Sequence, residues 1–111
     1  MALIITCLSL ISCYHDPIIP QTPAISFSTQ VQPIIIGNCT QSGCHGSDGR
    51  DLQLLTYTEV MQYVTPDNAH ASSLYTILTD IPVNRMPPSK YLTDNEINTI
   101  YLWIEQGARN N

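Results

Sequence analysis

Two cysteines and a histidine lie close together in the stretch NCTQSGCHG, residues 38–46. Four residues separate Cys39 from Cys44, and His45 follows Cys44 directly. Two thiols and an imidazole at this spacing suit three kinds of site. They could form a disulfide beside an unrelated histidine, they could ligate zinc, or they could attach a c-type haem.

A covalently bound haem is the chemistry that gives all three side chains a role. The two thiols add across the haem vinyl groups, and the imidazole of the residue after the second cysteine ligates the iron. The usual spacing has two residues between the cysteines, so the four found here make a longer loop. We therefore expect one haem c, attached through Cys39 and Cys44, with His45 as the proximal iron ligand.

The two other kinds of site stay open as alternatives. Zinc would need a fourth ligand, for which His70 is a candidate, and adjacent Cys44 and His45 would crowd a tetrahedral site. A disulfide between Cys39 and Cys44 would suit an exported protein, but it would leave His45 without a role.

A haem iron with both axial positions filled needs a second ligand, and three side chains are candidates. Met61 lies in TYTEVMQYV, a predicted helix, where a methionine usually fills a gap in the core. His70 lies in a polar turn. Met86 lies in NRMPPSKYLT, where two prolines restrict the backbone. We expect Met86 to be the distal ligand, because a rigid extended loop can hold a thioether at a fixed distance from iron.

The elements that would position these side chains are helices. In LTDNEINTIYLWIEQGA, Thr93 and Glu96 form a capping-box pattern, and Leu92 with Ile97 fits the hydrophobic staple that often accompanies one. Apolar residues then recur at helical spacing until Gly107, which is typical of a helix C-terminus.

Further helices are predicted before and after the cysteine motif. Phe27, Val31, Ile34 and Ile35 share one helical face, and Pro33 either starts a shorter helix or kinks this one. TYTEVMQYV and SSLYTILT indicate two short helices. No segment alternates well enough to predict a strand. The expected fold is all-α, a small helical domain wrapped around one covalently bound haem.

The N-terminal residues are typical of an export signal. MALIITCLSLIS is nearly all apolar or small and is too short to span a bilayer. It ends in LISC, which resembles the lipobox of bacterial lipoproteins and makes Cys13 the expected site of lipidation, although no basic residue precedes it. We expect a signal peptide at 1–12, a lipidated N-terminus and proline-rich tether at 13–26, and the folded domain at 27–109.

Composition excludes some classes of function. Of 111 residues, only four are Lys or Arg, and the net charge is −5, which argues against binding nucleic acid. The length suits a single domain whose core is small without a cofactor, metal or disulfide.

The chain resembles a small class I cytochrome c, most closely the exported cytochromes of Bacteroidetes- and Planctomycetes-type bacteria. VQPIIIGNC, CTQSGCHG, SSLYTIL and MPPSKYLTDNEINTIYLWIEQGA carry the resemblance, which runs from about Phe27 to Ala108. It implies that Cys39 and Cys44 are the thioether anchors, His45 the proximal ligand and Met86 the distal ligand. It also implies electron transfer.

These expectations define an electron carrier rather than an enzyme. With both axial positions filled, the iron would change charge without binding a small-molecule substrate. The partners would be redox proteins, and the protein would be periplasmic or outer-membrane-associated, held to a lipid membrane by its N-terminal anchor. Two alternatives stay open: a haem-based ligand-binding or sensing module, and a non-haem interaction lipoprotein whose cysteines form a disulfide. Trp103, Tyr101 and the isoleucines are candidates for lining the haem pocket or for ordinary core.

Overall fold

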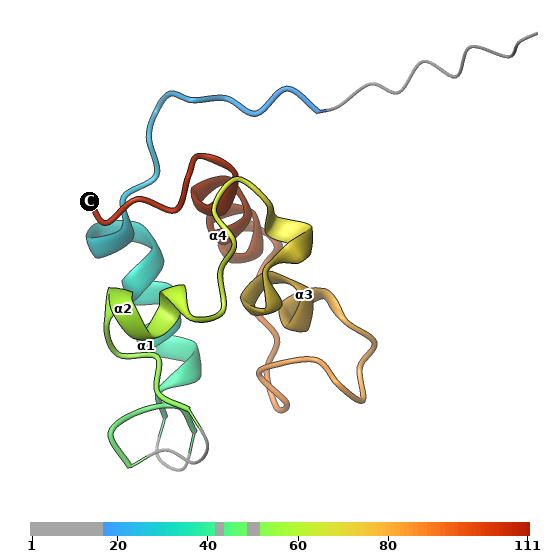
Figure 1. The fold of residues 1–111 in the computed structure, drawn as a ribbon. Coiled ribbons are helices and arrows are strands. Elements are labelled where there is room, and N and C mark those ends of the chain that lie inside the picture. Colours follow the sequence, from blue (N-terminus) through green and yellow to red (C-terminus); the bar gives the residue numbers. More distant parts are fainter. Residues whose placement is uncertain (1–16, 42–43, 49–51) are drawn as a thin grey trace, which may run out of the picture.

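The computed structural model describes residues 17–41, 44–48 and 52–111, and within these ranges the chain is helical with no strand. Figure 1 shows short helices joined by loops, with α1 and α2 on one side and α3 and α4 on the other. The all-α prediction is confirmed for this part of the chain. The predicted signal peptide and Cys13 lie outside the described residues.

The first helical run carries the cysteine motif at its end. A π-helical turn, Phe27–Val31, begins after Ser26, whose hydroxyl accepts a hydrogen bond from the Thr29 amide. It leads directly into α1, Gln32–Cys39. Pro33 therefore starts the α-helix and does not break it, because the first turn of a helix needs no amide donor at that position.

Two short helices follow the motif. The first, α2, covers Tyr57–Met61, and a complete capping box between Thr56 and Glu59 fixes its start. A 3-10 turn, Ala69–Ala71, was not predicted from the sequence and leads into α3, Ser73–Thr79. The two helices themselves were predicted, and the structure confirms them.

The last helix, α4, covers Asp94–Glu105. Both hydrogen bonds of the capping box between Thr93 and Glu96 are present, as the sequence predicted. Gly107 has a φ of 103°, the left-handed conformation that ends a helix and that glycine adopts at little cost. The start and the end of this helix are thus both set by local sequence.

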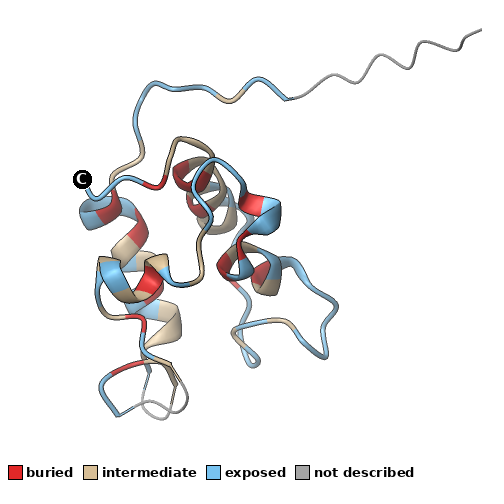
Figure 2. Ribbon diagram, viewed as in Figure 1, coloured by how far each residue is buried: buried red, intermediate tan, exposed pale blue. Residues whose placement is uncertain are grey.

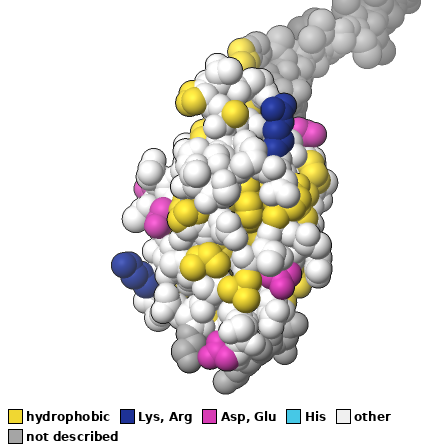
Figure 3. Space-filling view, turned by 90° about the vertical axis from the view of Figure 1, so that its left-hand side faces the viewer, with side chains coloured by type: hydrophobic (Ala, Val, Ile, Leu, Met, Phe, Trp, Pro, Cys, Tyr) yellow, Lys and Arg dark blue, Asp and Glu magenta, His cyan; other side chains and the backbone are white. Residues whose placement is uncertain are grey.

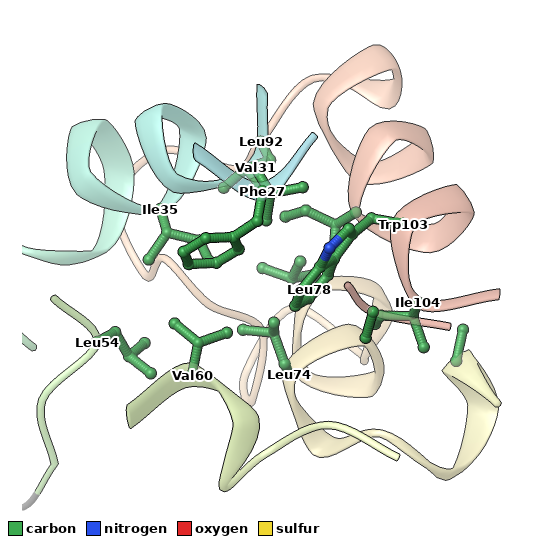
Figure 4. Close-up of a cluster of buried hydrophobic side chains, with 13 residues drawn as sticks. Phe27, Val31, Ile35, Leu54, Val60, Leu74, Leu78, Leu92, Trp103 and Ile104 are labelled. Carbon is green, nitrogen blue, oxygen red and sulfur yellow. The ribbon is translucent and has the colours of Figure 1, made fainter. Parts of the chain in front are cut away.

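The helices pack around one apolar core, and every helical element contributes buried residues to it (Figure 2). Phe27 and Trp103 form the centre of this core, with ring centroids 5.4 Å apart, and Tyr57 lies edge-on to both rings. Figure 4 shows side chains from both sides of the molecule meeting there, among them Val60 of α2 and Leu74 of α3. Trp103 is therefore core, and its indole nitrogen donates to the Arg109 carbonyl.

The proline-rich segment before the first helix is bound to the end of α4. The side chain of Gln106 accepts a hydrogen bond from the Ile25 amide and donates to the carbonyls of Pro20 and Pro23. In Figure 1 this segment leaves the domain beside the C-terminus, at the opposite end from the loop that follows α1. In the described part of the chain, no helix is both long and apolar enough to cross a membrane.

Candidate haem site

The cysteine motif starts at the last residue of α1 and folds back against it. Cys39 closes the helix, and its carbonyl accepts a hydrogen bond of 2.8 Å from the His45 amide. The Cys44 amide donates to the Gln41 carbonyl, also at 2.8 Å. The first of these bonds brings His45 back beside Cys39, and the second joins Cys44 to the residue that follows Thr40. Both cysteines are thiols in the structure.

Gly46 allows this close return. A Cβ atom built on Gly46 would lie 2.7 Å from the Thr40 carbonyl oxygen, which is closer than real Cβ contacts come. The obstructing atom is backbone, so it cannot rotate away as the end of a side chain could. The residue after His45 must therefore be glycine for the loop to close in this form.

The imidazole of His45 is held by a loop residue further along the chain. Its Nδ1 atom lies 3.2 Å from the Leu52 carbonyl oxygen, and the His45 carbonyl accepts from the Leu54 amide at 2.8 Å. A carbonyl oxygen can only accept, so Nδ1 carries the proton in this hydrogen bond. In the neutral form of the ring, Nε2 is then the nitrogen with a free lone pair. A backbone carbonyl on the other nitrogen is one of the usual partners that orient a metal-ligating histidine.

His45 lines an apolar pocket of about 320 Å³ that lies between the two sides of the molecule. Cys39 lines the same pocket, and so does Met86. Leucines and an isoleucine supply most of the remaining wall, together with three hydroxyl side chains: Leu52, Leu54, Leu74, Ile77, Leu78, Tyr63, Ser73 and Thr76. The volume falls in the range of small-molecule and cofactor sites. Cys44 does not line this pocket but is close enough to Cys39 to interact with it electrostatically.

Of the three candidates for a distal ligand, Met86 is the one that lines this pocket. Its side chain is 40% exposed, and its amide donates to the Ile77 carbonyl at 3.0 Å. Met61 ends α2 and packs against the core. His70 is exposed and lies edge-on to the Tyr75 ring in a second, polar cleft. The structure thus brings Cys39, His45 and Met86 together, and it places Met61 and His70 elsewhere.

The second cleft has a volume of about 500 Å³ and lies on a different face of α3. Tyr75 and Thr79 of α3 line it, whereas Leu74 and Leu78 face the apolar pocket. Tyr101, which we considered as a haem-pocket residue, lines this cleft and not the pocket. Burial and the nearby Glu105 and Tyr75 raise the pKa of Tyr101.

Burial changes the acidity of one of the two thiols. The pKa of Cys39 is raised from 9.0 to about 11. The larger cause is burial, which removes water from the thiol, and the smaller is the electrostatic effect of neighbouring Cys44. The thiol is therefore protonated at neutral pH. A neutral thiol suits an apolar pocket, where an unpaired thiolate would be costly to bury.

Some residues of the pocket were missed by the sequence reasoning. Leu74, Ile77 and Leu78 follow helical spacing, so a buried face of α3 was predictable, but the partner of that face was not. The Leu52 carbonyl gave no signal at all, because any residue can supply a backbone oxygen. Tyr63 lies two residues after the end of α2, and its place in the pocket wall depends on how α2 packs relative to α3.

Within the described part of the chain, no three His, Cys, Asp or Glu side chains are grouped so that they could hold a metal ion. The zinc site considered from the sequence, with His70 as fourth ligand, is not assembled there.

On the side of the molecule formed by α1 and α2, Figure 3 shows few, scattered charged side chains with exposed hydrophobic side chains between them.

Comparison with known proteins adds no relative: no protein-family model, curated protein or solved structure matches this chain.

Proposed function

We propose that this chain is a monohaem c-type cytochrome that carries single electrons between redox proteins outside the cytoplasmic membrane. The observation that supports it most is the convergence of Cys39, His45 and Met86 on one apolar pocket. Forty residues separate His45 from Met86 in the sequence, so the motif alone does not bring them together.

The donor set and its surroundings fit a haem. Cys39 and Cys44 would anchor it covalently, and His45 and Met86 would hold its iron. His45 has its Nδ1 proton engaged by the Leu52 carbonyl, which leaves the Nε2 lone pair for iron. The leucines of the pocket would cover an apolar macrocycle.

The bound haem would supply a one-electron iron couple, and the chain's own residues would set its properties. Methionine ligation favours the reduced state relative to a second histidine, which raises the reduction potential. An apolar wall acts in the same direction, because it disfavours the extra positive charge of the oxidised state. With Met86 as the second residue on the iron, no position would be left for a small substrate, so the protein would pass electrons only.

The N-terminal expectations form part of the same proposal. Export would bring the chain to a compartment where c-type haem is attached, and lipidation of Cys13 would hold it at a membrane surface. Cys13 lies outside the described residues. The binding of residues 20–25 to Gln106 supports a chain that leaves the domain at the end opposite the haem motif.

An optical spectrum separates this proposal from its two alternatives. The full chain would be produced with a cytochrome c maturation system and measured in both oxidation states, with and without carbon monoxide. A c-type spectrum with a methionine–iron band and no response to carbon monoxide supports electron transfer. A c-type spectrum that responds readily supports a sensing module. A protein without haem leaves the interaction lipoprotein.

A further inference from the structure

The loop that carries Met86 depends on individual contacts, because it contains no helix or strand between α3 and α4. Helix α3 ends at Thr79, so the carbonyls of its last turn have no partner within the helix. Two of them are bound by adjacent residues of the loop. The Ile77 carbonyl accepts from the Met86 amide at 3.0 Å, and the Leu78 carbonyl accepts from Arg85 Nε at 2.7 Å.

Arg85 reaches the other end of the same loop as well. Its guanidinium carbon lies 4.4 Å from the centroid of the Tyr91 ring, which is a cation–π contact. Tyr91 immediately precedes Leu92, which is buried in the core, and Thr93, which caps α4. One side chain therefore links the end of α3 to the start of α4 and closes the loop around Met86.

The position of Arg85 suits its charge. A cation at a helix C-terminus is stabilised by the carbonyls that converge there, and the guanidinium group can donate to one of them while its flat face lies on an aromatic ring. Lysine could reproduce the charge but not this combination of a fixed donor and a flat face. Met86 itself is 40% exposed, so surrounding core does not hold its side chain in place.

From these contacts we propose that Arg85 is the positioning residue of Met86. Its hydrogen bond to the Leu78 carbonyl and its cation–π contact with Tyr91 keep the loop closed and hold the thioether in the wall of the pocket. This inference rests on the proposed function, since it concerns a ligand of the haem. It gives Arg85 and Tyr91 the role of keeping small ligands away from the iron. Opening of the loop would expose the iron to small ligands.

The test compares four variants of the haem-loaded full chain: Arg85→Gln, Tyr91→Leu, Lys90→Gln and Met86→Ala. Lys90→Gln is the matched control, because Lys90 is exposed in the same loop and its replacement removes the same charge. The rate of carbon monoxide binding to the reduced protein measures how often the Met86 sulfur dissociates from the iron. A second readout is hydrogen exchange of the Met86 amide, which reports directly on its bond to Ile77.

We expect Arg85→Gln and Tyr91→Leu each to speed carbon monoxide binding and Met86 amide exchange about tenfold, equivalent to about 1.4 kcal/mol. Lys90→Gln should match the wild type in both. If Arg85→Gln fails to fold, Tyr91→Leu tests the other end of the contact. Wild-type behaviour of both Arg85→Gln and Tyr91→Leu, or an equal change in Lys90→Gln, would overturn this inference and leave the proposed function standing. Unaltered carbon monoxide binding in Met86→Ala would instead overturn the proposed distal ligand, and this inference with it.

Discussion

The Nδ1 atom of His45 lies 3.2 Å from the carbonyl oxygen of Leu52, so the last residue of the cysteine motif is oriented by the loop that follows it. This hydrogen bond fixes which imidazole nitrogen carries the proton. The geometry of the site also depends on Gly46, where a Cβ atom would lie 2.7 Å from the Thr40 carbonyl oxygen. The motif therefore works as a folded unit, and its glycine is as necessary to that unit as its histidine.

Replacing Gly46 tests this dependence. Gly46→Ala should lower the free energy of unfolding by about 1–3 kcal/mol, because the new methyl group meets the Thr40 carbonyl. Gly37→Ala is the control, since nothing lies within 4 Å of a Cβ there and alanine is the better helix former. Denaturant unfolding measures both. Equal effects of the two substitutions would show that the loop is looser than described.

The acidity of Cys39 predicts a pH dependence for the protein before haem attachment. The pKa of this thiol rises from 9.0 in the unfolded chain to about 11 in the folded protein. Between these values the unfolded state loses a proton that the folded state keeps. Folding stability should therefore be complete below pH 9 and should fall as the pH approaches 11, by up to about 3 kcal/mol.

Comparison with Cys39→Ser isolates this contribution from other groups that titrate in the same range. The difference in unfolding free energy between wild type and Cys39→Ser should shrink as the pH rises from 9 to 11. A difference that stays constant with pH would mean that the Cys39 thiol is not held protonated by burial.

Replacing Met86, the proposed distal ligand, should open the proposed haem iron. Met86→Ala should lower the reduction potential, abolish the methionine–iron band and let carbon monoxide bind the reduced protein, while folding largely survives. Met61→Ala should leave the spectrum unchanged and cost roughly 2 kcal/mol of stability, because Met61 packs against the core. If Met86→Ala had no spectral effect and His70→Ala did, the distal ligand would be His70.

The N-terminal anchor can be tested separately from the haem. Cys13→Ser should move the protein from the membrane fraction to the soluble fraction without altering the haem spectrum, because the anchor and the pocket are different parts of the chain. Mass spectrometry of the mature wild-type protein should place a lipid on Cys13 as its first residue. A mature N-terminus elsewhere would refute the lipidation.

Local sequence signals predicted the helices well. The capping box at Thr93 and the glycine after α4 are short-range features, and the structure forms both as expected. Pro33 could not be placed from sequence, because its effect depends on whether the preceding turn can adapt, which it does as a π-helix. The 3-10 turn at Ala69–Ala71 was missed because so short an element has no periodicity to detect.

The site was predictable only where chemistry is encoded in residue type. Cys39, Cys44 and His45 carry distinctive side chains whose spacing suggested their roles, and the two prolines after Met86 singled it out among three candidates. The Leu52 carbonyl and the Arg85 contact to Tyr91 are tertiary relationships, so no pattern in the sequence indicates them. Trp103 was ambiguous for the same reason, since a large aromatic residue suits either a haem pocket or a core.

Covalent attachment of haem is the claim on which the account depends most directly. The measurement is the intact mass of the full chain, produced with a cytochrome c maturation system and extracted with acidified acetone, which removes haem that is not covalently bound. The account predicts a mass that still includes one haem, and a loss of that mass when Cys39 and Cys44 are both replaced by alanine. A wild-type mass equal to that of the polypeptide alone would contradict it.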